Sequence, residues 1–153
     1  MSTTNDAART LTLKRTFDAP VELVWEAWTR PEHIAQWWGP KGMKINVIEH
    51  NFIVGGHWKY TMPMPDGSEF VSEGVYSVID QFRKIVSSAE FRPMTEGVEI
   101  QAIFEAKGNK TDFTFNVVHP TEEYAKQQNA MGFSKGWGSV LDRLGDFARS
   151  LQK

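Results

Sequence analysis

The stretch PVELVWEAWTRPEHIAQWWGP, residues 20–40, carries the strongest local pattern in the chain. Its apolar residues recur at the i, i+3, i+4 and i+7 positions of one helical face, namely Val21, Val24, Trp25 and Trp28. A second short helix is predicted from Pro31, with Thr29 and Glu32 at the spacing of a capping box. Gly39 and Pro40 would end it. The stretch therefore predicts two short consecutive helices.

The two adjacent tryptophans, Trp37 and Trp38, fall on the last turn of the second predicted helix. Neighbouring residues of a helix point about 100° apart, so both rings cannot share one direction. We expect one ring to fill the core. Trp38, beside the Gly-Pro stop, is a candidate for the rim of a pocket or, failing that, for a surface that contacts a partner protein.

The flanking sequence predicts strands on both sides of these helices and a long helix at the end. Apolar residues alternate with polar ones, or occur in short runs between turn residues. The predicted strands are 9–17, 43–52, 55–62, 70–80, 84–91, 98–106 and 111–119. A helix of about 30 residues is expected after Pro120, up to Leu151. Short links between the strands favour an antiparallel meander.

We therefore predict an α+β fold in which a curved antiparallel sheet of about seven strands wraps a long C-terminal helix. The two short helices lie between the first and second strands and close one end of the space between sheet and helix. Residues 1–8 are expected to form a flexible tail, and residues 9–153 a single domain.

The composition excludes several classes of function. The formal net charge is -2 and Lys and Arg form no block, which argues against a nucleic-acid partner. The chain has no cysteine and no apolar signal region near its N-terminus, so we expect a cytoplasmic protein. No run of about 18 apolar residues occurs, so no membrane span is predicted.

Four separate segments resemble one known family. They are RTFDAPVELVWEAWTRPEHIAQWWGP (15–40), GGHWKYTMPMPDG (55–67), SEGVYSVID (72–80) and GFSKGWGSVLDRL (132–144). In order and spacing these are similar to single-domain homologues of the activator of heat-shock-protein-90 ATPase, within the SRPBCC or START-like superfamily. The resemblance spans roughly residues 9–150. It implies a helix-grip fold with a hydrophobic cavity between the long helix and the sheet.

The resemblance also implies what the cavity takes. Relatives in the superfamily bind lipids, sterols, polyketides or plant hormones, and a few catalyse cyclisation. The eukaryotic namesake stimulates a chaperone ATPase and carries a separate N-terminal domain for much of that work. Only eight residues precede the first predicted strand here, which argues against a chaperone-activator role without excluding a chaperone partner.

The predicted function is the binding of a small, mainly hydrophobic molecule in that cavity, with no chemistry assigned. Aromatic residues make up 12% of the chain, a content that suits either a core or a ligand pocket. The candidate ligand-binding residues are Trp38, Trp58, Tyr60, Met62, Tyr76, Phe91, Phe104, Met131 and Trp137.

Two other functions stay open from the sequence. One is a chaperone-related or homodimer-forming interaction module, which would place Trp37 or Trp38 in an exposed apolar patch. The other is a small cyclase- or hydrolase-like enzyme, which needs a histidine, or a carboxylate such as Glu26, Glu73 or Glu90, pointing inward. The histidines have no metal-ligand spacing, so we predict no metal and no cofactor, and assign no catalytic residue.

Overall fold

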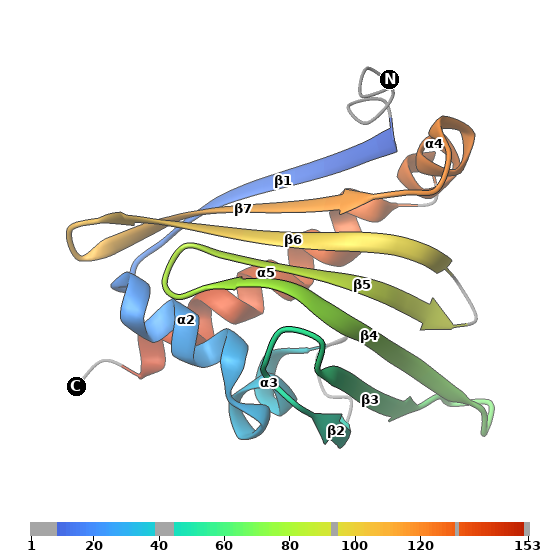
Figure 1. The fold of residues 1–153 in the computed structure, drawn as a ribbon, viewed down its shortest axis with the longest axis horizontal. Helices are drawn as coiled ribbons and strands as arrows, with labels where there is room; N and C mark the ends of the chain where they lie inside the picture. Colours follow the sequence, from blue (N-terminus) through green and yellow to red (C-terminus); the bar gives the residue numbers. More distant parts are fainter. Residues whose placement is uncertain (1–8, 39–44, 93–94, 131, 152–153) are drawn as a thin grey trace.

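The computed structural model describes residues 9–38, 45–92, 95–130 and 132–151. These residues form a sheet and four helices, in the order shown in Figure 1. The elements are β1 (Thr10–Phe17), α2 (Val21–Thr29), α3 (Pro31–Trp37), β2 (Asn46–His50), β3 (His57–Pro63), β4 (Glu69–Asp80), β5 (Lys84–Arg92), β6 (Thr95–Lys107), β7 (Lys110–Val118), α4 (Glu122–Ala130) and α5 (Phe133–Ser150).

The strands form one seven-stranded antiparallel sheet in the order β1-β7-β6-β5-β4-β3-β2. Strands β2 to β7 follow one another as a meander, and β1 pairs with β7, where Leu13 lies opposite Phe115. The β6–β7 hairpin closes at the Lys107–Lys110 pair, where Gly108 has a φ of 63°. The predicted strands are confirmed to within a few residues at their ends.

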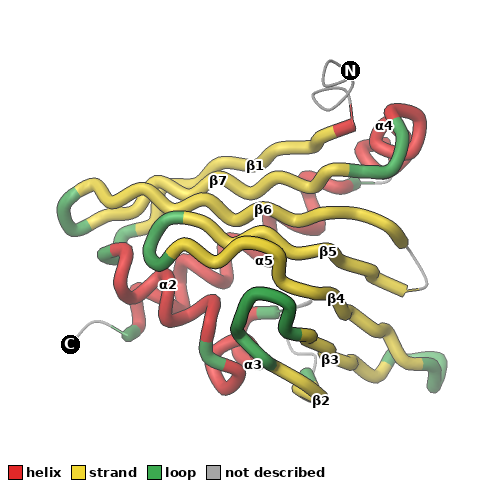
Figure 2. Tube along the Cα trace, in the orientation of Figure 1, coloured by secondary structure: helices red, strands yellow, loops and turns green. Residues whose placement is uncertain are grey.

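The helices cover one face of the sheet, so the molecule has two layers (Figure 2). Helix α5 runs behind the strands, α2 lies at the left-hand ends of the central strands, and α3 lies beside β2 (Figure 1). Helix α2 contacts α5, β6 and β7, whereas α3 contacts β2 and α5. This is the predicted helix-grip arrangement. In the described part of the chain no helix is both long and apolar enough to cross a membrane.

Two local predictions were wrong. The expected helix of about 30 residues is divided into α4 and α5, because Gly132 adopts a left-handed conformation (φ 100°) that an α-helix cannot continue through. The capping box is also absent. Thr29 is the last residue of α2, and Arg30 precedes Pro31 as the N-cap of α3 without a side-chain capping bond.

A close approach of α5 to β1 depends on a glycine. The ring of Phe17 packs against Phe113, with ring centroids 5.3 Å apart, and its other side faces α5 at Gly145. A Cβ atom at position 145 would lie 2.6 Å from Cδ1 of Phe17, well inside van der Waals contact. Only glycine therefore allows this separation between helix and strand.

Replacing Gly145 with alanine should destabilise the protein. Alanine favours a helix by about 1 kcal/mol over glycine, but overpacking against a buried ring costs about 1–3 kcal/mol. We expect a net loss in the free energy of unfolding, measured by urea denaturation.

Gly138→Ala is the matched control on the same helix. A Cβ there would meet only Nη2 of Arg15, at 2.8 Å, and the end of a flexible side chain can move away. This variant should be neutral or more stable than the wild type. A Gly145→Ala variant that gained stability as Gly138→Ala does would contradict the packing described for Phe17.

Candidate functional site

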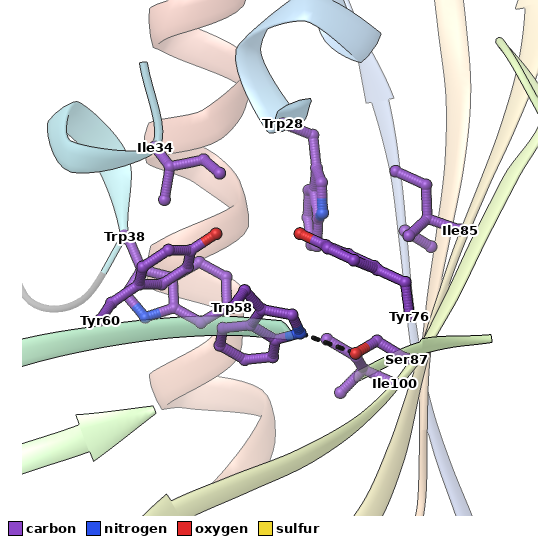
Figure 3. Close-up of a pocket in the computed structure, with 10 residues that line it drawn as sticks. Trp28, Ile34, Trp38, Trp58, Tyr60, Tyr76, Ile85, Ser87 and Ile100 are labelled. Atoms are coloured by element: carbon purple, nitrogen blue, oxygen red, sulfur yellow. Dashed lines mark hydrogen bonds between the residues drawn. The ribbon is translucent and has the colours of Figure 1, made fainter. Parts of the chain in front are cut away.

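The interior between the sheet and the helices contains a small cavity that aromatic side chains surround (Figure 3). Its volume is about 10 Å³, close to the space that a single water molecule needs. Helices α2 and α3 and strands β3 to β6 supply its described lining. The lining residues are Trp28, Ile34, Trp38, Trp58, Tyr60, Tyr76, Ile85, Ser87, Ile100 and Ala102.

Strand alternation explains why these side chains converge. Residues two apart on a strand share a face, so Trp58 and Tyr60 of β3 both point inward, as do Ser87 and Ile85 of β5. Trp58 has room because its neighbour on β4 is Gly74, where a Cβ atom would lie 3.0 Å from Cζ2 of Trp58. The Trp58 indole N–H donates a hydrogen bond of 2.7 Å to Ser87 Oγ.

The two adjacent tryptophans are both buried but make different contacts. Trp37 is 1% exposed, and its indole N–H donates to the backbone oxygen of Ala27 at 2.8 Å. Trp38 is 8% exposed and lines the cavity, with its ring edge-on to Trp58 and Tyr60 at centroid distances of 5.7 and 5.4 Å. Neither Trp37 nor Trp38 forms the exposed patch that an interaction module would require.

The structure brings four of the nine candidate ligand-binding residues together around the cavity. They are Trp38, Trp58, Tyr60 and Tyr76. Met62 and Phe104 are buried elsewhere in the core. Trp137 packs on Trp38, with ring centroids 5.9 Å apart. Met131 and the side chain of Phe91 lie outside the described residues.

Sequence reasoning missed several lining residues on β5 and β6. Ile85 and Ser87, and likewise Ile100 and Ala102, are spaced two apart and so share the inner face of the sheet. That spacing was visible in the sequence. Ser87 and Ala102 were missed because the search for lining residues relied on aromatic side chains. Their small side chains leave space that the large rings partly fill.

A half-buried histidine contacts one of the tyrosines. His50 Nε2 lies 2.7 Å from the backbone oxygen of Thr29, and His50 Nδ1 lies 2.8 Å from the hydroxyl of Tyr60. Burial lowers the pKa of His50, although its hydrogen bond to Thr29 opposes that effect. Burial likewise raises the pKa of Tyr60 and of Tyr76 above the ordinary tyrosine value, so both hydroxyls stay uncharged at neutral pH.

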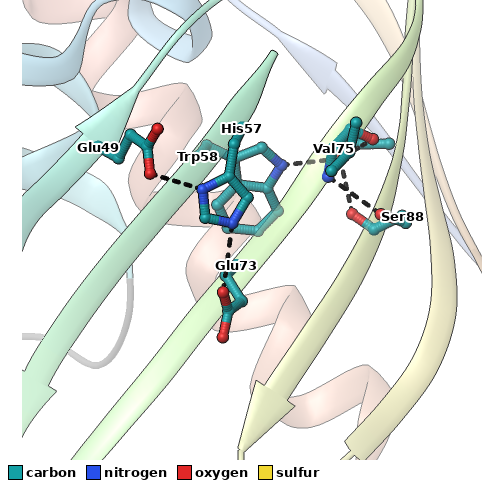
Figure 4. Close-up of polar contacts among 7 residues, drawn as sticks. Glu49, His57, Trp58, Glu73, Val75 and Ser88 are labelled. Atoms are coloured by element: carbon teal, nitrogen blue, oxygen red, sulfur yellow. Dashed lines mark hydrogen bonds and ion pairs between the residues drawn. The ribbon is translucent and has the colours of Figure 1, made fainter. Parts of the chain in front are cut away.

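A second histidine lies on the outer face of the sheet (Figure 4). His57 Nδ1 is 2.6 Å from Glu49 Oε1, and His57 Nε2 is 3.2 Å from Glu73 Oε1. The hydrogen bond that His57 donates to Glu49, assisted by Glu73, raises the pKa of His57. His57 therefore lies on the opposite face from Trp58, as the alternation of side chains along a strand requires.

No carboxylate is among the described residues that line the cavity. Glu73 points outward to His57, and Glu26 lies 3.5 Å from Arg30 in an ion pair. None of the lining residues is an acid, a base or a histidine. Among the residues that the structure describes, no group of three His, Asp or Glu side chains is arranged to hold a metal ion.

The sequence and this geometry agree with one protein family. The family model described as "Activator of Hsp90 ATPase homolog 1-like protein" matches residues 18–148, most of the chain. The chain belongs to this family. The match includes both short helices, the strands β2 to β7 and nearly all of α5.

Solved structures of several bacterial proteins share the fold. A crystal structure from Nitrosomonas europaea is 26% identical with a TM-score of 0.81, covering 95% of this chain and 97% of that chain. A solution structure from Staphylococcus epidermidis is also 26% identical, with a TM-score of 0.80 and coverages of 95% and 92%. A Rhodobacter sphaeroides structure at 17% identity and a TM-score of 0.85 covers 95% and 96% and shows the fold alone. No curated protein matches the chain.

The two histidines should titrate in opposite directions from 6.5, the ordinary value for histidine. His50 should take up its proton below pH 6.5, because burial disfavours the charged ring, and His57 above it, because two carboxylates favour the charged ring. A pH titration of the histidine ring signals by NMR would measure both pKa values.

The His57→Gln variant assigns the outer-face signal. The tautomer of His50 gives an independent check, since its ¹⁵N shifts should report a protonated Nε2 and an unprotonated Nδ1 at pH 7.5. Coincident titration of His50 and His57 near pH 6.5 would contradict the described environments.

Proposed function

We propose that the protein binds a small, uncharged, mainly apolar molecule in the space between the sheet and helix α5. The observation that carries the proposal is the lining of the central cavity, which combines three tryptophans and several aliphatic side chains with two uncharged hydroxyls, those of Tyr60 and Tyr76. Ligand sites are typically apolar with a few placed polar groups. The fold of this family commonly encloses hydrophobic ligands, which supports the same function.

The size of the cavity means that binding requires movement. Ligand pockets usually hold about 300–1,000 Å³, whereas this cavity holds about 10 Å³. At least one large side chain must therefore leave. Trp38 is the best placed, because at 8% it is the most exposed of the lining residues and its indole N–H bond to Ser72 Oγ is long, at 3.4 Å. Trp58 is 2% exposed and has the shorter bond to Ser87, so it is expected to stay.

The energetics favour moderate affinity. Burying about 300 Å² of apolar surface gains about 7 kcal/mol at 25 cal/mol per Å². Moving Trp38 and immobilising the ligand both subtract from this gain. A net free energy of about -8 kcal/mol would be needed for a micromolar dissociation constant. We therefore expect dissociation constants in the micromolar range or weaker for small probes.

The binding function is favoured over the two alternatives. An interaction module would need Trp37 or Trp38 in an exposed aromatic patch, and both are buried. A catalyst needs an ionisable group beside its substrate, whereas His50 reaches the cavity only through Tyr60. Neither alternative has a described site of its own.

Naphthalene should bind the wild-type protein with 1:1 stoichiometry. The six tryptophan indole N–H groups supply built-in reporters in a ¹⁵N-correlated NMR spectrum. Signals from Trp28, Trp38 and Trp58 should shift with a common saturation curve, because these rings line the cavity. The Trp25 signal should barely move, because that ring packs away from the cavity against Phe52, Phe82 and Phe104.

The Trp38→Leu variant tests the role assigned to Trp38. Removing this ring opens the cavity in advance, so naphthalene should bind the variant more tightly and raise its melting temperature more than that of the wild type. Trp25→Leu is the control, since it removes a buried indole elsewhere. Absence of saturable shifts in both the wild type and Trp38→Leu would refute the proposed function.

A further inference from the structure

The ring of Trp38 is enclosed by aromatic side chains from both layers of the fold. It lies beside the cavity, next to Tyr60 and Trp58 (Figure 3). Ring centroids lie 5.4–6.2 Å from that of Trp38 for a set of neighbours from α2, α3, β3 and α5. These neighbours are Trp28, Trp37, Trp58, Tyr60 and Trp137. The place that Trp38 occupies is therefore bounded largely by aromatic surface.

The angles between these rings favour an aromatic occupant. Four of the neighbouring rings meet Trp38 at 72–83°, which is edge-to-face geometry. In such a contact the positive edge of one ring meets the negative face of the other, which adds to the energy of burial. An aliphatic group in the same place gains only the burial. The space that an indole leaves is also flat, so it suits a planar molecule.

One polar atom faces this place. Ser72 of β4 lies opposite Tyr60 of β3, so its side chain points inward, and it is 2% exposed. Its Oγ atom accepts the indole N–H of Trp38 at 3.4 Å. When Trp38 moves away, this buried oxygen loses its donor, which costs free energy. A ligand that brings a donor to the same position removes that cost.

A free molecule can make this bond better than Trp38 does. Trp38 is the C-cap residue of α3, and its backbone N–H donates to the backbone oxygen of Ile34 at 2.9 Å. That attachment limits where its indole ring can lie. Bonds from N–H to oxygen usually measure about 2.9–3.0 Å between the heavy atoms. A ligand without the attachment can approach Ser72 to that distance.

We propose that the Trp38 ring fills the ligand's place in the free protein, and that the molecule which displaces it is a flat bicyclic aromatic compound with a hydrogen-bond donor on its edge, as indole has. The inference rests on the proposed binding function and names its class of ligand. The rings that enclose Trp38 hold the bicyclic ring, and Ser72 accepts its donor. A hydrocarbon of the same shape lacks the second interaction, and a flexible alkyl chain lacks the first.

The test compares probes that differ in one property at a time. Indole, benzofuran and benzothiophene have one shape and differ in a single ring atom, and only indole carries an N–H donor. The fourth probe, 1-octanol, has a donor on a flexible alkyl chain. In calorimetric titrations of the wild type, indole should bind several-fold more tightly than each of the other three.

Ser72→Ala should abolish the preference for indole over benzothiophene, by a different route in each background. In the wild type it removes the bond that Trp38 must give up, so benzothiophene should bind several-fold more tightly and indole should change little. In Trp38→Gly the place is already open, so indole should bind several-fold more weakly and benzothiophene as before. A purely structural role of Ser72 would change both probes alike. Ser77→Ala, at an exposed position of the same strand, is the matched control and should change neither.

The indole N–H signal of Trp38 measures its displacement directly. Its absence from the spectrum of Trp38→Leu assigns it. Saturation with indole should expose this N–H to exchange with solvent and leave the Trp25 signal unchanged. Trp38→Leu replaces Trp38→Gly in the titrations if the glycine variant does not fold.

The outcomes distinguish this inference from the proposed function. Binding of benzothiophene with no preference for indole, or equally tight binding of 1-octanol, would overturn the inference and leave the binding function standing. Saturable binding of indole with the Trp38 signal unchanged would also overturn it. Failure of every probe, naphthalene included, to bind the wild type and Trp38→Leu would overturn both.

Discussion

The backbone oxygens at the end of helix α2 are the constraint on which the rest of the interior depends. They have no partner within the helix, and burial makes an unpaired oxygen costly. Trp37 of α3 donates to Ala27, and His50 of β2 donates to Thr29. Both donors are rings. Each ring therefore pairs with a backbone oxygen of α2 and also packs in the interior. The same two bonds tie α3 and the edge strand β2 to the end of α2.

The end of helix α2 also influences a polar group of the cavity lining, the Tyr60 hydroxyl. Because the Thr29 oxygen accepts from Nε2 of His50, Nδ1 of the neutral ring accepts the proton of the Tyr60 hydroxyl. The surrounding rings pack closely enough to leave about 10 Å³. Close packing stabilises the empty protein through many small contacts, and any ligand must replace those contacts with its own. An uncharged molecule of similar polarity does so at the lowest cost.

Much of the fold could be predicted because it depends on local pattern. Alternation placed Trp58 and Tyr60 on one face of β3 and His57 on the other, and the helical spacing of Trp25 and Trp28 placed both rings inside. The predictions failed where one residue's conformation decided the outcome. Gly132 reads as a tolerated helix glycine until its left-handed conformation is known, and it then separates α4 from α5.

Periodicity along the chain was enough to specify the strands, the two short helices and the residues that face inward, since each of these depends on neighbours a few positions apart. The tertiary structure alone decided what those inward residues do. His50 lies 21 residues from Thr29, and no local pattern predicts a bond that forms only when β2 packs beside α2. The cavity volume is likewise a small difference between two large volumes: the space that the sheet and helices enclose, and the volume of the side chains that fill it. A difference of that kind depends on how all the rings pack together, so it could not be read from the list of residues.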